Sequence, residues 1–395
     1  MIGKELLANR ELADEVIAMR RHIHEYPGVS EHEEETMKYI AGKMEEWGIP
    51  YEAGIADTGV VALIQGAEDG PCVGIRADID ALPIQEETGL PYASKIPGVM
   101  HACGHDCHAA ILLGVAKVLS GMRSQLKGSV KLFFQPAEES IGGANRMIQA
   151  GCLENPHVDC VIGLHMAVGH PTGEIGIKYG KMYAASDMID ITVKGRSAHG
   201  ASPHEGVDTI AVAAAIINTV QTVVSRNVDP VDSAVCSFGM IHGGTVRNQI
   251  SDRVEMSGII RTLTPESRVF VREQVKNIAE GVAKSMRAEA EFTLTESYGP
   301  TICDPKVVSV VERTCKGLLG EENVVHEPYP ELGTEDFSYF AMERPSCYIH
   351  LGCYHEKLGE RFGAHNCHYV IDEDALMIGV AMQVENTLAL LEEKF

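Results

Sequence analysis

The strongest constraint on the fold is an alternation of short β-type runs with helical segments along the first 165 residues. The runs typical of strands lie at residues 59–65, 73–77, 130–134 and 160–165. The helical segments lie at residues 5–26, 30–47 and 109–122, and Ser30 and Glu33 have the spacing of a capping box. Strands that alternate with helices pair into a sheet with helices on both faces. We therefore predict an α/β domain with a central mixed sheet flanked by helices.

The pattern changes between residues 186 and 292. Six elements follow in the order strand, helix, strand, strand, helix, strand, at residues 187–193, 207–224, 233–241, 253–261, 265–286 and 288–294. This is the order of a ferredoxin-like α+β sandwich, which can bury a core of its own. A strand at 347–352 and a helix at 374–394 then return to the first domain. We predict a first domain of residues 1–182 and 297–395, interrupted by an inserted domain at residues 183–296.

Charge and cysteine content restrict the partners and the compartment. The formal net charge of −23 repels phosphate backbones and anionic membranes, so no nucleic-acid or membrane partner is expected. The longest apolar stretch, residues 210–224, contains polar residues and is shorter than the roughly 20 residues of a membrane span, which favours a buried helix. Eleven cysteines without regular spacing, and charged residues throughout the first 21 positions, predict a cytoplasmic protein with reduced thiols.

The densest group of chemically active side chains is residues 101–108, with three histidines, two cysteines and an aspartate. A structural zinc knuckle needs paired Cys or His spacings close by, and Cys103 and His105 have no such neighbours. From the residue types alone, a metal role stays open beside ordinary packing and solvated histidines.

Acidic and histidine side chains also follow the predicted strands: Asp78 and Asp80, Glu138 and Glu139, and His165. In open α/β sheets, functional groups gather just beyond the carboxyl ends of the strands. Two vicinal glutamates suit metal-assisted hydrolysis, because one can bind the metal while the other transfers a proton. His365, before the last helix, is a further candidate ligand.

Together these segments resemble the M20 metallopeptidase and amidohydrolase family, in the branch of hippurate hydrolases, N-acetyl-amino-acid deacetylases and auxin-conjugate hydrolases. The resemblance covers nearly the whole chain. Its motifs are residues 21–24 with Pro27, 76–83, 100–108, 135–139, 194–199, 333–337 and 365–366. The Cys103-Gly104-His105-Asp106 element is highly specific, since other branches of the family use a different metal shell.

Carried over residue by residue, the resemblance implies two divalent metal ions per subunit. The implied ligands are Cys103, His105, Glu139, His165 and His365. Glu138 is the implied general base and acid, and Asp78 or Asp80 would orient the site by contacting a ligand. Thiolate and imidazole ligands suit Zn²⁺, and the resemblance also permits Mn²⁺, Ni²⁺ or Co²⁺.

The inserted domain resembles the lid and dimerisation domain of the family. In a homodimer or higher homo-oligomer, His199 is implied to reach the neighbouring catalytic centre and to stabilise the oxyanion of the intermediate. Asn248 is a candidate donor to the substrate. Arg247 or Arg261 could pair with a substrate carboxylate by charge complementarity.

We therefore predict a metal-dependent amidohydrolase that cleaves small N-acyl amino acids, such as N-acetyl or N-benzoyl derivatives, to a carboxylic acid and a free amino acid. Hydroxide bound to the two-metal centre would attack the amide carbonyl. Two alternatives stay open: a cysteine hydrolase with Cys103 as nucleophile, and a non-catalytic metal-binding scaffold. The sequence does not define the acyl group or the amino acid.

Overall fold

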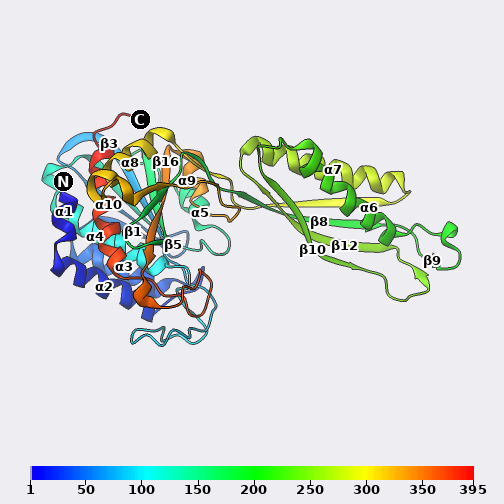
Figure 1. Ribbon diagram of the computed structural model, residues 1–395, viewed down its shortest axis with the longest axis horizontal. Coiled ribbons are helices and arrows are strands. Elements are labelled where there is room, and N and C mark those ends of the chain that lie inside the picture. Colours follow the sequence, from blue (N-terminus) through cyan, green and yellow to red (C-terminus); the bar gives the residue numbers. More distant parts are fainter. Residues whose placement is uncertain (1) are drawn as a thin grey trace. The chain divides into compact units, whose positions relative to one another are not determined.

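The computed structural model describes residues 2–395, which form two compact units (Figure 1). Unit 1 comprises Met1–Gly180, Ile302–Tyr329 and Asp336–Phe395, and unit 2 comprises Lys181–Thr301 and Pro330–Glu335. The structure differs from the predicted boundaries chiefly in the segment 330–335. This segment joins unit 2 because the backbone N–H of Ala184 lies against the carbonyl oxygens of Glu331 and Gly333, at 3.0 and 3.1 Å.

Unit 1 is built on an eight-stranded mixed sheet. In spatial order its strands are β1 (Tyr51–Ile55), β2 (Gly59–Gln65), β4 (Lys127–Gln135), β3 (Glu68–Asp78), β5 (Cys160–Pro171), β16 (Ser346–Tyr354), β6 (Ile175–Ile177) and β15 (Val324–His326). The four central strands β4, β3, β5 and β16 are parallel, whereas β1, β2 and β6 introduce antiparallel pairs. Strand β4 is buried along all but its first residue, as expected for the centre of a covered sheet.

Helices flank this sheet, as the sequence predicted. They are α1 (Ile2–Leu7), α2 (Arg10–Glu25), α3 (Glu34–Glu46), α4 (His105–Gly121), α5 (Gly143–Gln149), α8 (Pro305–Leu319), α9 (Ser338–Glu343) and α10 (Asp374–Leu390). Helix α4 packs against α2, α10 and the strands β3 and β5, while α5 and α9 pack on one another (Figure 1). The single helix predicted at residues 5–26 is wrong: Asn9 separates α1 from α2, because its side chain caps α2 by accepting the N–H of Leu12.

Unit 2 has the predicted ferredoxin-like order. Its elements are β8 (Ala185–Lys194), α6 (Thr209–Thr222), β10 (Ala234–Gly243), β12 (Arg253–Thr262), α7 (Pro265–Ser285) and β13 (Glu289–Glu296). The four strands form an antiparallel sheet in the order β10-β12-β8-β13. Apolar side chains of the sheet and of both helices, among them Ile191, Val212 and Val275, form a core that belongs to unit 2 alone.

Among the described residues, one helical stretch, Thr209–Asn227, is long and apolar enough to span a membrane by length and composition alone. It packs Val212, Ile216 and Val220 into the core of unit 2, which is what a core helix of a globular domain does. The sequence predicted a buried helix, and this is only half right. One face is buried, but Ile210 on the opposite face is 49% exposed.

Candidate metal centre

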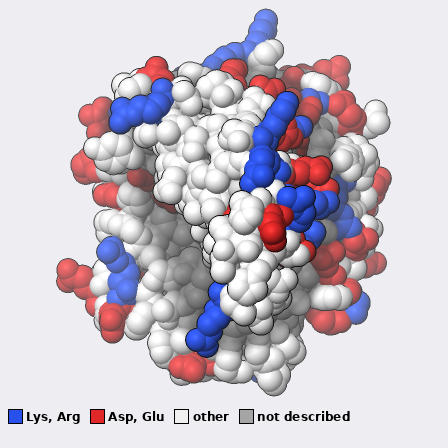
Figure 2. All heavy atoms as spheres, turned by 90° about the vertical axis from the view of Figure 1, so that its right-hand side faces the viewer, with Lys and Arg blue, Asp and Glu red and all other residues white. Residues whose placement is uncertain are grey.

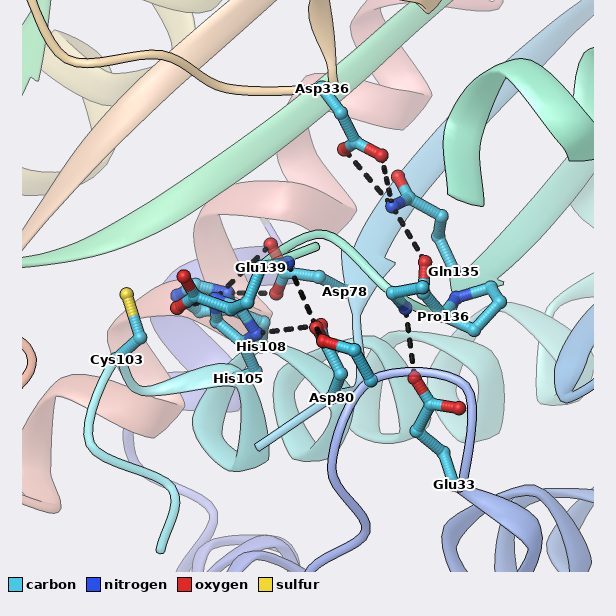
Figure 3. Close-up of polar contacts among 12 residues, drawn as sticks. Glu33, Asp78, Asp80, Cys103, His105, His108, Gln135, Pro136, Glu139 and Asp336 are labelled. Carbon is cyan, nitrogen blue, oxygen red and sulfur yellow. Dashed lines mark hydrogen bonds and ion pairs between the residues drawn. The ribbon is translucent and has the colours of Figure 1, made fainter. Parts of the chain in front are cut away.

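The predicted site residues of unit 1 meet beyond the carboxyl ends of the central strands. Asp78 ends β3 and lies opposite Gln135, which ends β4, so the segments that follow these strands run side by side. The backbone N–H of Glu139 donates to Asp80 Oδ2 at 2.9 Å, which joins the two segments directly (Figure 3). The placement inferred from the topology of an open sheet is therefore what the structure shows.

Cys103 and His105 lie at the start of α4, with Gly104 between them. Gly104 has φ of +93°, a left-handed conformation that favours glycine, and a Cβ there would lie 3.1 Å from Met166. The Nδ1–H of His105 donates to Asp80 Oδ1 at 3.1 Å. The Nε2 atom is thereby left unprotonated in the neutral ring, and it is buried without a hydrogen-bond partner among residues 2–395.

His165 and His108 differ in their availability as ligands. His165 donates from Nδ1 to the carbonyl oxygen of Met166 at 2.9 Å, so its Nε2 carries a lone pair. This lone pair accepts the thiol of Cys103 at 3.4 Å and can bind a metal once the thiol is deprotonated. His108 uses both ring nitrogens, because Nδ1 donates to Asp78 and Nε2 accepts the N–H of Met166. His108 therefore positions the backbone beside His165 and is not available as a ligand.

Glu139 and His365 complete the cluster. His365 Nε2 lies 3.2 Å from Glu139 Oε1, and the backbone N–H of His365 donates to Ala102 at 2.7 Å, beside Cys103. The ligand atoms of Cys103, His105 and His165 lie within 4.8 Å of one another, and so do those of Cys103, Glu139 and His365. The five predicted ligands thus form two triads that share the thiol of Cys103.

This donor set fits divalent cations. His105 Nε2 is buried and lacks a hydrogen-bond partner of acceptable geometry within the described part of the chain, a costly arrangement unless something else binds it. His105 and His165 each have their other nitrogen fixed by an acceptor, as is usual for a metal-ligating histidine. Sulfur, nitrogen and carboxylate oxygen within one cluster are the ligands of Zn²⁺ and neighbouring transition metals.

The pKa values follow the same arrangement. Burial raises the pKa of the Cys103 thiol to about 12. Burial alone would lower the pKa of His105, but the charge of Asp78 and the thiol of Cys103 raise it well above its usual value. Burial would raise the pKa of Asp80, yet the hydrogen bond from His105 lowers it. Asp80 is therefore a carboxylate at neutral pH and an acceptor for His105.

The structure distinguishes the two aspartates that the sequence left undecided. Asp80 accepts from His105, from Ser30 Oγ at 2.7 Å and from the backbone of Glu139. Asp78 instead receives Arg76 and His108, and is fully buried. Asp80 orients the predicted ligand His105 through its Nδ1, whereas Asp78 holds His108, which is not a predicted ligand.

Two residues that sequence reasoning assigned to a helix cap in fact support this site. Helix α3 begins at Glu34 without a side-chain cap, so the capping box predicted for Ser30 and Glu33 is wrong. Ser30 donates to Asp80, and Glu33 accepts the N–H of Ala137 at 2.9 Å and Thr58 Oγ1 at 2.5 Å. Glu33 is fully buried, which its polarity in the sequence did not indicate.

Unit 2 carries the other predicted residues. His199 is exposed in the short strand β9 (Ala198–His199), which pairs with β11 (Gln249–Ile250). The carbonyl of Asn248 accepts the N–H of Gly200 at 2.7 Å, so His199 and Asn248 lie on adjacent segments, with Arg247 next in the chain. Arg261 is not part of this group. Arg253 begins β12 three residues after β11 ends, near this group, whereas Arg261 lies eight residues further along β12, roughly 26 Å away at 3.3 Å per residue.

His199 is held in one tautomer. The N–H of Ala201 donates to His199 Nδ1 at 3.0 Å, so in the neutral ring the proton is on Nε2. An exposed imidazole with its N–H on the outer nitrogen is a hydrogen-bond donor to a bound group.

Known proteins resemble this chain over nearly its whole length. Residues 74–387 match the model of peptidase family M20/M25/M40. Thermostable carboxypeptidase 1 of Saccharolobus solfataricus is 38% identical over 98% of this chain and 96% of its own length. N-acetylcysteine deacetylase of Bacillus subtilis is 38% identical over 98% of this chain and 99% of its own length.

Solved structures agree with the sequence comparisons. The Bacillus subtilis YxeP protein, a dinuclear metal-binding peptidase of family M20, superposes with a TM-score of 0.86 at 36% identity, over 97% of this chain and 99% of its own. The fold and the family resemblance predicted from the motifs are thereby confirmed. The chain belongs to peptidase family M20/M25/M40 and is a hydrolase of amide bonds.

Proposed function

We propose that this hydrolase is a two-metal amidohydrolase that releases the amino acid from small N-acyl amino acids. The observation that carries the proposal is the pair of ligand triads that share Cys103, next to the second carboxylate of Glu138. The name of the Bacillus subtilis relative, N-acetylcysteine deacetylase, supports an N-acyl amino acid as the substrate class. The carboxypeptidase relative is compatible with it, because the last residue of a peptide is itself an N-acylated amino acid.

The proposed ligands are the five residues of the two triads. Cys103, His105 and His165 would hold one ion, and Cys103, Glu139 and His365 the other. Zn²⁺ suits the thiolate and imidazoles best, and Mn²⁺, Ni²⁺ and Co²⁺ are compatible with the same set. When bound, the ions supply Lewis-acid polarisation of the scissile carbonyl and lower the pKa of the attacking water.

Glu138 is the proposed proton carrier. It is buried, at 8% exposure, and directly precedes the proposed ligand Glu139 on the loop that Glu33 and Asp80 hold in place. Its carboxylate would take a proton from the attacking water and deliver it to the leaving nitrogen as the amide bond breaks. A metal-binding scaffold has no use for this second carboxylate, which disfavours the non-catalytic alternative.

His199 is the proposed oxyanion donor, supplied by a second copy of the chain. The hydrogen bond from Ala201 occupies Nδ1 and leaves the proton on Nε2, so the Nε2–H can donate to a developing negative charge. Figure 2 looks onto unit 2 and shows a broad area without Lys, Arg, Asp or Glu side chains. Strand β10 is an edge strand with Met240 and Ile241 exposed, which supports self-association through this unit.

Asn248 and Arg247, beside His199, are proposed to contact the substrate amide and carboxylate. Arg261 is a weaker candidate within unit 2, because it lies toward the other end of the sheet and its guanidinium donates to the backbone of Ile260.

The rival mechanism uses Cys103 as a nucleophile. Burial raises the pKa of this thiol to about 12, so without a bound cation the reactive thiolate is scarce at neutral pH. A thiol that binds a metal ion loses its proton to coordination, so the high pKa of the metal-free thiol does not prevent it from acting as a ligand. The pKa therefore favours a ligand over a nucleophile.

A substrate screen tests the proposal. N-acetyl, N-benzoyl and longer N-acyl amino acids, together with dipeptides, are incubated with Zn²⁺- and Mn²⁺-loaded enzyme, and release of the free amino acid is measured. Glu138→Gln is the inactive control. Activity that survives exhaustive chelation but is lost on alkylation would replace this proposal by the cysteine mechanism.

A further inference from the structure

A second group of ligand-type side chains lies in unit 1 and shares no residue with the Cys103 cluster. His170 is on β5, Glu174 follows β5 in a turn, Glu327 directly follows β15, and His350 is on β16. His350 pairs in register with His165 of the neighbouring strand β5, so the two groups lie on adjacent strands. Nothing in the proposed hydrolytic reaction uses these four residues.

Their contacts converge on one carboxylate oxygen. Glu327 Oε1 lies 2.9 Å from His170 Nε2 and 2.8 Å from His350 Nδ1. The other nitrogen of His170, Nδ1, donates to Glu174 Oε1 at 2.6 Å. The ligand atoms of His170, Glu327 and His350 lie within 4.8 Å of one another.

We propose that His170, His350 and Glu327 form a third divalent-cation site, independent of the two-metal centre. Two imidazoles and one carboxylate are a common ligand set for Zn²⁺, and they also suit Ni²⁺ and Co²⁺. Glu174 has the position of the carboxylate that fixes a ligating imidazole through its second nitrogen. Three protein ligands leave a fourth position for water.

The two distances to Glu327 permit this site after a small adjustment. A tetrahedral ion with bonds of about 2.0–2.1 Å separates its ligand atoms by about 3.4 Å. The two contacts to Glu327 therefore have to open by about 0.5 Å. Both ring nitrogens of His170 donate to carboxylates, so the Nε2 proton leaves to solvent as the ion binds. Lys178 Nζ donates to the backbone carbonyl of Glu327 at 2.7 Å, so its charge is directed to the backbone and not to the carboxylate.

Gly176 makes room for this carboxylate. It lies opposite His350 on strand β6, and a Cβ built at position 176 would meet Glu327 Oε1 at 2.2 Å and His350 Cβ at 3.1 Å. A larger residue at position 176 would displace the Glu327 carboxylate from the cluster. Such a substitution therefore disturbs the site without removing any of its four polar side chains. The cluster is also shielded, since the side chain of His350 is only 5% exposed and those of His170 and Glu327 are 19% and 16% exposed.

Metal analysis of variants tests the site. Wild-type protein, Gly176→Ala and His170→Gln are equilibrated with Zn²⁺ at pH 7.5, freed of excess metal by gel filtration, and analysed for zinc per chain. We expect the wild type to hold one more Zn²⁺ than either variant. Gly169→Ala, on the same strand as His170 with nothing within 4 Å of the added Cβ, and His326→Ala, an exposed histidine on neighbouring β15, should match the wild type.

A variant of the other centre separates this site from the proposed function. Cys103→Ser combined with His105→Ala should still bind one Zn²⁺, and adding Gly176→Ala should abolish it. This result is expected even if the two-metal proposal fails. Equal zinc content in wild type, Gly176→Ala and His170→Gln, or equal loss in the two control variants, would overturn the site and leave the four residues as a hydrogen-bonded ion cluster.

Discussion

Replacing Asp80 with asparagine is expected to weaken metal binding while leaving the fold intact. Asp80 Oδ1 holds the Nδ1–H of His105 at 3.1 Å and thereby leaves Nε2 free as a ligand. An asparagine that turns its NH₂ toward His105 places donor against donor. The ring then favours the tautomer with the proton on Nε2, which cannot bind a metal.

The magnitude follows from the single contact that is lost. A hydrogen bond to a charged group contributes about 1.5–3 kcal/mol, and loss of such an outer partner typically lowers metal affinity about 10- to 100-fold, which is about 1.4–2.7 kcal/mol. We therefore expect the Kd for Zn²⁺ to rise about 10- to 100-fold, measured by competition with a chromophoric chelator. Activity at saturating metal should fall less than activity at limiting metal.

Two neighbouring variants serve as controls. Ser30→Ala removes a donor from Asp80 Oδ2 but leaves the contact with His105, so metal affinity should change less than about threefold. Asp78→Asn removes one of the two buried carboxylates that pair with Arg76, the other being Asp336, and we expect a loss of about 1–3 kcal/mol in the free energy of unfolding. If Asp78→Asn lowered Zn²⁺ affinity more than Asp80→Asn, the assignment of Asp80 as the orienting carboxylate would be wrong.

Four further outcomes are expected. Glu138→Gln should keep both ions and lower kcat about 10²- to 10⁴-fold, whereas Glu139→Gln should lose metal. Elemental analysis and kinetics of both variants test this, and the reverse pattern would mean that the two residues have exchanged roles. Burial raises the pKa of metal-free Cys103 to about 12, so in chelated enzyme the rate of its labelling by iodoacetamide should rise about tenfold per pH unit above pH 7. In metal-loaded enzyme the rate should not rise in this way, and mass spectrometry of labelled Cys103 measures both rates. Inactive His199→Ala and Glu138→Gln chains should regain activity when mixed under subunit exchange, and heterodimers that form but stay inactive would refute the cross-subunit role. Burial raises the pKa of Glu86, but hydrogen bonds from His24, Thr88 and Ser94 lower it overall, to about 2. The resulting stability is present above the usual value of 4.5 and lost as pH falls toward 2, so Glu86→Gln should cost about 2 kcal/mol in urea unfolding at pH 7 and nothing near pH 2.

The sequence predicted the elements that bury a strongly patterned face. The six elements of unit 2 were found in order because each alternates or repeats its apolar residues clearly enough to form a separate core. Helix α8 was not predicted, although its signals are present: Asp304 caps it, Pro305 begins it, and Gly320 with φ of +100° ends it. Short strands such as β6 and β15 carry too few residues for a pattern and form only because partner strands pair with them.

The sequence allowed the proposed ligands to be named, and the structure brings them together, but it gave no sign of the contacts that orient them. Asp78 and Asp80 stand two residues apart around a buried strand end, and local sequence gives no reason to prefer one. The difference arises because Asp78 still belongs to β3 and meets Arg76, while Asp80 has left the strand and reaches His105. Ser30 could not be recognised for a similar reason, since its partner Asp80 is 50 residues away.

The loop that carries Glu138 and Glu139 owes its position to carboxylates from three distant segments. Glu33 accepts the N–H of Ala137 and Asp80 that of Glu139, both at 2.9 Å (Figure 3). Asp336 accepts the N–H of Ala144 at 3.0 Å, at the start of helix α5, which follows the loop. Ala137 has φ of +55°, a strained conformation for a residue with a Cβ, which persists only where surrounding contacts enforce it.

These three contacts have a consequence for catalysis. Charge-assisted hydrogen bonds contribute about 1.5–3 kcal/mol each, which is enough to fix the loop when the chain folds. The entropy of ordering the proposed ligand and the proposed base is therefore lost during folding and not during binding of metal or substrate. Side chains that never contact the substrate thus determine how well Glu138 is placed for proton transfer, because misplacement by about 1 Å can cost about 10²-fold in rate.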